Sequence, residues 1–287
     1  MKSYKRILKH SLIILGIATG LVLWLYKYGG GSFWRGFGES VDEVNVSGEG
    51  ESGEEFGLHK IKTFYELICG GEGENTFAGD FGGDKVKTTV GGMDIEKIKK
   101  EYDEFKDLND DLIGIVDVNG LGFNYPVMRS ETPNYYLNHD LFKNYSVFGC
   151  PYMGEGYSII NKNIVIYGHC INKDKMFGKL LSLKNKRVMD KVKRICFYGE
   201  SGLIEYEVVA LLSINVDDTD YRYWEIKDFN DEREFDEYAD GIIENGIYVN
   251  EEKLKCGNYL MLSTCDNELG GGYRIVLVGR MIENGIY

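Results

Sequence analysis

Apolar residues recur at helical spacing in two segments of the 287-residue chain. The first follows residue 93, where Asp94 is suited to cap the opening turn of an amphipathic helix. Its apolar positions are Ile95, Ile98, Tyr102 and Phe105. The second is the charged amphipathic run 228–245, which predicts a helix inserted between strands.

Short apolar runs bounded by turn residues predict the strands. These runs cover 112–118, 122–127, 163–167, 194–198, 203–215, 258–263 and 273–282. Asn119-Gly120 supplies turn chemistry between the first two, and 133–137 predicts a short helical turn. A closed antiparallel barrel with helical excursions fits this set of elements.

The N-terminal segment predicts a membrane anchor. Four basic residues precede the uncharged run 11–26, and the apolar stretch is about long enough to cross a bilayer. No small-x-small cleavage site follows the run, which favours an uncleaved anchor over a signal peptide. We therefore predict a cytoplasmic tip and transmembrane anchor over residues 1–28, with the rest of the chain outside the cell.

Two further regions follow the predicted anchor. Residues 29–92 are rich in glycine and acidic residues, which predicts a flexible tether because such a segment buries little apolar surface. Residues 93–287 carry the patterned segments and form the predicted folded domain.

Composition narrows the possible partners and cofactors. The chain has 46 acidic and 33 basic residues, for a net charge of −13, which argues against a nucleic-acid partner. Its six cysteines show no C-x-x-C spacing, so neither a zinc knuckle nor a thioredoxin-like motif is expected. We predict no metal site.

A cysteine, a histidine and an arginine stand at the ends of predicted strands. His169 follows an apolar strand, as does Cys265, and Arg274 opens the next strand nine positions later. A nearby imidazolium favours the nucleophilic thiolate, and a guanidinium can hold a developing oxyanion. His139 is the other candidate histidine in the folded region.

Each of these residues also has an ordinary structural explanation. Cys265 can be a small buried side chain, His169 a surface residue and Arg274 an ion-pair partner. The order of histidine before cysteine excludes a papain-like arrangement, in which the cysteine comes first. The residues alone leave both explanations open.

Six segments, in order along the chain, resemble the class B sortases. They are Asn124-Tyr-Pro-Val-Met128, Tyr135-Tyr-Leu-Asn-His139, Ile164-Val-Ile-Tyr-Gly-His169, Met176-Phe-Gly-Lys-Leu180, Leu262-Ser-Thr-Cys265 and Tyr273-Arg274-Ile-Val-Leu-Val. The 96 positions between His169 and Cys265 leave room for the helix-bearing insertion of this class. The resemblance covers about residues 94–287.

The resemblance implies a mainly β fold, namely a closed eight-stranded sortase-type barrel. It has an N-terminal helix and a helix inserted before the nucleophile strand. It also implies that Cys265 attacks the threonine carbonyl of a sorting signal, that His169 exchanges protons and that Arg274 binds the oxyanion or the peptide backbone. Ser263, Thr264 and Tyr273 become candidate substrate-binding residues.

The implied partners are surface proteins that bear a sorting signal, a peptidoglycan-precursor amine and the membrane. No cofactor is expected. Two alternatives remain: a sortase that polymerises pilins, and a non-enzymatic, membrane-tethered surface-binding domain with an inert Cys265. The chain departs from the class at Cys170, where an asparagine is frequent, and at Gly154, where an aspartate is common.

Overall fold

A computed structural model describes residues 89–90 and 93–286. The predicted anchor at 1–28 lies outside these residues, and so does almost all of the predicted tether at 29–92. In the described part of the chain, no helix has both the length and the apolarity to span a bilayer.

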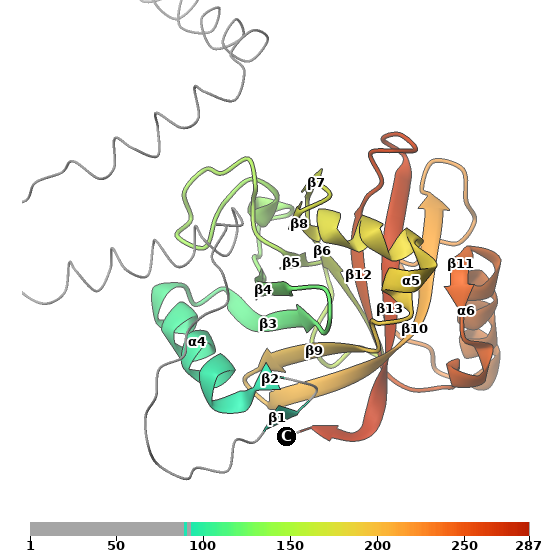
Figure 1. The fold of residues 1–287 in the computed structure, drawn as a ribbon, viewed down its shortest axis with the longest axis horizontal. Coiled ribbons are helices and arrows are strands. Elements are labelled where there is room, and N and C mark those ends of the chain that lie inside the picture. Colours follow the sequence, from blue (N-terminus) through green and yellow to red (C-terminus); the bar gives the residue numbers. More distant parts are fainter. Residues whose placement is uncertain (1–88, 91–92, 287) are drawn as a thin grey trace, which may run out of the picture. The chain divides into compact units, whose positions relative to one another are not determined.

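Eight strands close into a mixed barrel, which confirms the expected fold (Figure 1). Around the barrel they are β10 (Gly202–Asn215), β13 (Tyr273–Ile286), β12 (Tyr259–Cys265), β6 (Asn163–Tyr167), β5 (Tyr152–Met153), β4 (Phe123–Met128), β3 (Leu112–Val118) and β9 (Arg194–Gly199). The pairing of β9 with β10 closes the ring, and β11 (Gly246–Val249) adds to the outer side of β10.

The expectation of an antiparallel barrel is wrong at two places. Strand β6 runs parallel to β12, and β4 runs parallel to β5. Parallel neighbours need a long crossover between them, and the chain from β6 to β12 supplies one.

Smaller elements cover the ends and the outside of the barrel. They are β1 (Thr89–Val90), β2 (Met93–Asp94), α4 (Ile95–Leu108), η1 (Tyr135–Leu137), β7 (Cys170–Asn172), β8 (Lys175–Met176), η2 (Phe177–Lys184), α5 (Lys186–Met189), α6 (Glu232–Glu244) and η3 (Glu251–Lys253). Figure 1 shows α4 beside β3 and β9, and α6 outside β11.

The predicted N-terminal helix forms for the expected reasons. The Asp94 side chain accepts a hydrogen bond from the Lys97 amide at 3.2 Å, which caps α4. Ile98, Tyr102 and Phe105 are buried on one face of the helix. The Tyr102 ring meets Tyr198 of β9 edge to face at 5.5 Å, so the helix packs on the outside of the barrel.

The inserted helix α6 is joined to β6 by a buried polar contact. Asn163 begins β6 and is fully buried. Its amide donates to the Ile226 carbonyl at 2.7 Å, and its side-chain oxygen accepts from the Tyr238 hydroxyl of α6 at 3.2 Å. Because these groups would otherwise be buried without partners, the contact favours one placement of the insertion.

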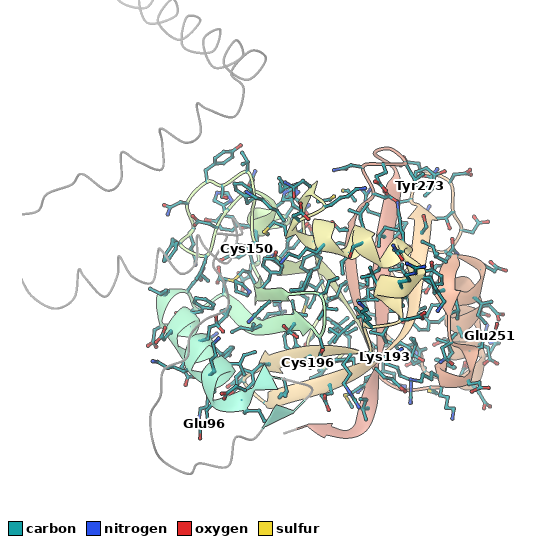
Figure 2. All side chains as sticks on the ribbon, in the orientation of Figure 1. Glu96, Cys150, Lys193, Cys196, Glu251 and Tyr273 are labelled. Atoms are coloured by element: carbon teal, nitrogen blue, oxygen red, sulfur yellow. The ribbon has the colours of Figure 1, made fainter. Side chains whose placement is uncertain are left out.

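A half-buried carboxyl on the barrel generates a pH-dependent prediction. Asp117 of β3 lies opposite Cys196 of β9, which Figure 2 labels. Burial raises the pKa of Asp117 to about 6. The charged form is therefore less stable in the folded chain than in the unfolded one, and the penalty grows as pH rises through about 6.

We expect Asp117→Asn to raise the melting temperature at pH 8, and this gain to shrink steadily as the pH falls from 7 to 4. Thermal unfolding, followed by circular dichroism at several pH values, measures the difference in melting temperature between the variant and the parent. Asp107→Asn, which changes an exposed carboxylate on α4, is the matched control. A gain that is the same at pH 4 and pH 8 contradicts the assignment.

Candidate active site

Two strand ends bring the candidate histidine and cysteine to the same rim of the barrel. Parallel strands end at the same edge of a sheet, and β6 ends at Tyr167 while β12 ends at Cys265. His169 follows β6 by two residues, so it leaves the barrel on the side of Cys265. The structure therefore brings together two residues that are 96 positions apart.

Arg274 lies on the other side of the cysteine. In the antiparallel pair of β12 and β13, Cys265 and Arg274 are direct cross-strand partners. The Arg274 guanidinium donates to the carbonyls of Gly271 and Tyr273 at 2.7 and 2.9 Å, which holds it over its own hairpin. Only one of its nitrogens is used, so other donors remain for a ligand.

All three residues line one cavity of about 570 Å³, called here the Cys265 cleft. Each of the three is half-buried, so the cleft is open to solvent. Sequence reasoning missed seven other residues that line it: Asn134, Leu137, Tyr152, Glu155, Tyr157, Tyr167 and Trp224. Tyr167 and Leu137 belong to elements that the sequence predicted, while the others come from loops and a two-residue strand without a strong pattern.

His169 is oriented by Leu137, which lines the same cleft. Its Nε2 lies 2.6 Å from the carbonyl oxygen of Leu137, at the end of η1. A carbonyl only accepts, so Nε2 carries the proton in this contact. His139, the other candidate, stacks on Tyr135 at 3.9 Å and does not line the cleft. The geometry therefore favours His169.

Gly168 allows this arrangement by its size. A Cβ at this position would lie 2.3 Å from the ring of Phe177, which is closer than atoms can approach. The φ of Gly168 is not in the left-handed region, so the backbone conformation does not require a glycine here. Close packing against Phe177 is the physical reason for a glycine here.

The predicted substrate-binding residues have different surroundings. Ser263 and Thr264 line the cleft but are almost fully buried. The Ser263 hydroxyl lies 2.8 Å from the Tyr223 hydroxyl, and the Thr264 hydroxyl donates to the Gly168 carbonyl at 2.8 Å. Both hydroxyls are thus used within the protein. Tyr273, labelled in Figure 2, does not line the cleft.

A buried ion pair supports the end of the nucleophile strand. The Asp266 side chain is fully buried and pairs with Lys184 of η2, which also contacts Glu268 at 3.2 Å. A buried carboxylate beside Cys265 would oppose a thiolate if it were unpaired. Lys184 offsets that charge.

The tyrosines around the cleft remain protonated at neutral pH. Burial, with help from the nearby negative charges of Glu155 and Cys265, raises the pKa of Tyr152 to about 12. Burial likewise raises the pKa of Tyr223 to about 12. The hydroxyls of Tyr152, in the wall of the cleft, and of Tyr223, behind Ser263, are therefore neutral groups.

The bond from Thr264 to Gly168 generates a test of positioning. We expect Thr264→Val to slow alkylation of Cys265 by iodoacetamide about three- to ten-fold at pH 7 and to shift its pH profile, since the loop carrying His169 loses an anchor. Thr264→Ser keeps the donor and should retain most of the rate. Equal rates for the valine and serine variants contradict the role.

Two curated proteins are similar to this chain in sequence. Sortase B of Listeria monocytogenes is 26% identical over 211 residues, covering 69% of this chain and 79% of that protein. Sortase B of Staphylococcus aureus is 23% identical over 192 residues, covering 66% and 77%. No family model matches the chain.

A solved structure shows the same fold. The Staphylococcus aureus sortase B–substrate complex superposes with a TM-score of 0.56 at 22% identity, over 65% of this chain and 87% of that one. The fold and the two curated relatives agree. The two curated relatives and the shared fold support a class B sortase, a cysteine transpeptidase by class.

Proposed function

We propose that this chain cleaves a sorting signal after threonine, holds the acyl part as a thioester on Cys265 and transfers it to an amine of the cell wall. The observation that carries the proposal is the meeting of Cys265, His169 and Arg274 in one solvent-open cleft. The relative solved as a substrate complex supports a sorting-signal peptide as the ligand.

The first half of the reaction forms a thioester. The Cys265 thiolate attacks the threonine carbonyl carbon, and the Arg274 guanidinium stabilises the negative charge that develops on the oxygen. The carbon–nitrogen bond then breaks, and His169 gives its proton to the leaving amine. The Cys265 cleft suits this step because Tyr152, Tyr157, Tyr167 and Trp224 give it an apolar wall against which the acyl part of the peptide can pack.

The second half of the reaction transfers the acyl group. An incoming amine loses its proton to His169 and attacks the thioester carbon. The carbon–sulfur bond breaks, and the thiolate of Cys265 is regenerated. Electrons and protons therefore balance with no cofactor.

The anchor prediction completes the proposal. Basic residues followed by the uncharged run 11–26 support an N-terminal membrane anchor, with the catalytic domain on the extracellular side. A sortase acting on exported proteins at a Gram-positive surface needs this placement, because its sorting-signal and amine substrates lie outside the membrane.

The nucleophile can be tested directly. We expect the purified protein to cleave fluorogenic peptides from a library with threonine before the scissile bond. Cys265→Ala should abolish cleavage, since it removes the attacking sulfur. Cys150→Ala and Cys196→Ala, at buried cysteines outside the cleft, are the controls. Cleavage by Cys265→Ala at the parent rate would falsify the assignment.

The proton and oxyanion roles predict graded losses. We expect His169→Ala and Arg274→Ala each to reduce kcat/KM by about 10²-fold or more, the usual scale for such groups. His139→Ala should have a small effect, because that ring lies outside the cleft. Full loss in His139→Ala with activity in His169→Ala would reverse the choice of histidine. Steady-state kinetics with the selected peptide measure all three variants.

A further inference from the structure

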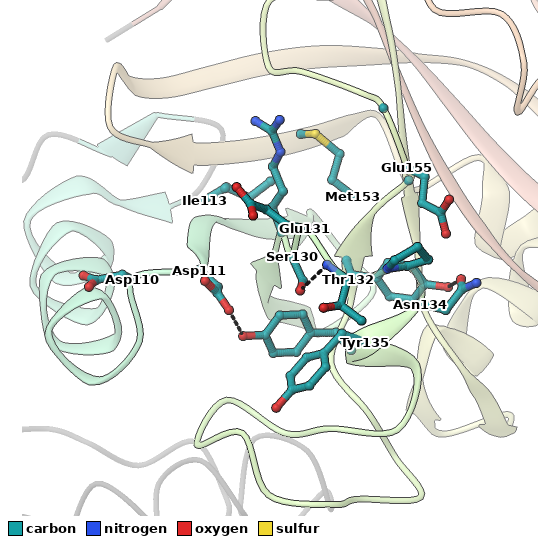
Figure 3. A pocket seen from close by; sticks show the side chains of 16 residues that line it. Asp110, Asp111, Ile113, Ser130, Glu131, Thr132, Asn134, Tyr135, Met153 and Glu155 are labelled. Atoms are coloured by element: carbon teal, nitrogen blue, oxygen red, sulfur yellow. Dashed lines mark hydrogen bonds between the residues drawn. The ribbon is translucent and has the colours of Figure 1, made fainter.

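A second cavity adjoins the Cys265 cleft and is not used by the steps above. It encloses about 810 Å³ between the end of α4 and the loop that leads to η1, and is called here the polar cavity (Figure 3). Its wall includes Asp110, Asp111, Arg129 and Glu131. It shares Asn134, Tyr152 and Glu155 with the Cys265 cleft.

This adjacency distinguishes the polar cavity from two other hollows of the described domain. A groove of about 520 Å³ beside α5 and β11 shares no wall residue with the Cys265 cleft. A smaller cavity of about 230 Å³ near Tyr102 and Phe197 also shares none. A molecule in the polar cavity can therefore reach the reactive sulfur over a common wall.

The charges of the polar cavity indicate what it binds. Four carboxylates line it, against the one guanidinium of Arg129. Asp111 is already satisfied, because it pairs with Lys143 at 3.0 Å and accepts the Tyr136 hydroxyl at 2.6 Å. No Lys or Arg of the described residues forms an ion pair with Asp110, Glu131 or Glu155, which are exposed.

These three unpaired carboxylates extend along the cavity. In the view of Figure 3, Asp110 lies at one side, Glu155 at the other and Glu131 between them. Carboxylates on a concave wall add their fields, which attracts a cation more than a single surface carboxylate does. The Cys265 cleft has a different character, since Leu137, Tyr157, Tyr167 and Trp224 dominate its wall.

The two-step reaction requires two binding places. The acyl part of the sorting peptide still fills the Cys265 cleft when the amine arrives, so the acceptor must approach from adjoining space. We infer that the polar cavity binds the amine acceptor as a peptide that carries positive charge beyond its attacking amine. This inference rests on the proposed transpeptidation and names the acceptor class and its place.

The proposed transfer step, in which the acceptor amine attacks the thioester, breaks one bond for each bond it forms. The acceptor amine, once deprotonated by His169, forms a bond to the thioester carbon while the carbon–sulfur bond breaks. Glu155 stands on the shared wall, where it holds a charge of the acceptor near the thioester. Asp110 and Glu131 lie beyond the Cys265 cleft and bind the rest of the cationic peptide.

The experiment compares two acceptors of similar size, Gly-Gly-Lys-amide and Gly-Gly-Gln-amide, with the full chain and a saturating sorting peptide. We expect kcat/KM for the acceptor to be about three- to ten-fold higher with the lysine peptide at low ionic strength. The double variant Asp110→Asn/Glu131→Gln should bring this ratio close to one. The variant Glu232→Gln/Asp236→Asn removes two exposed carboxylates on α6 and should keep the parent ratio.

Equal use of the two acceptors by the parent, or a preserved ratio in the Asp110/Glu131 variant, overturns the inference. Titration calorimetry of both acceptors with Cys265→Ala protein tests the same preference without turnover. If the proposed transpeptidase function itself is wrong, the result differs, because no sorting peptide is cleaved. Calorimetry still reports whether the cavity prefers the cationic peptide.

Discussion

The parallel pairing of β6 with β12 is the constraint on which the site depends. It joins Asn163–Tyr167 to Tyr259–Ser263 inside a closed barrel, and both strands are buried along most of their length. Because parallel strands end at the same edge, the residues after them must share a rim. His169 and Cys265 meet for this reason, although neither segment by itself positions the other.

Several interactions hold that rim in place. The Thr264 hydroxyl links the two strand ends through Gly168, and Lys184 neutralises the buried Asp266 beside the cysteine. On the outer side, the insertion that bears α6 contacts the same strands through the Asn163 and Ser263 side chains. Buried polar groups with specific partners permit few alternative placements, so a site at a barrel edge becomes well defined.

The two adjoining cavities differ in polarity, and each suits a different substrate of the proposed reaction. The more apolar Cys265 cleft suits the acyl part of a peptide, while the polar cavity suits a hydrated, charged partner. Glu155 belongs to both walls and follows Gly154, one of the two positions at which the sequence departs from the class B pattern.

The chain's own pattern determined the helix after Asp94, the long strands and the candidates Cys265, His169 and Arg274. Local spacing and turn residues were sufficient to find these elements. Strand partners were not predictable, because a period of two residues is the same in parallel and antiparallel sheets, so the antiparallel barrel was wrong. Two-residue strands such as β5 and the loop walls of the cleft carry too few positions for a pattern. Only the tertiary structure showed that the hydroxyls of Ser263 and Thr264 form hydrogen bonds within the protein. It also placed Tyr273 outside the cleft. Burial and hydrogen-bond partners could not be predicted because they are set by segments distant in sequence.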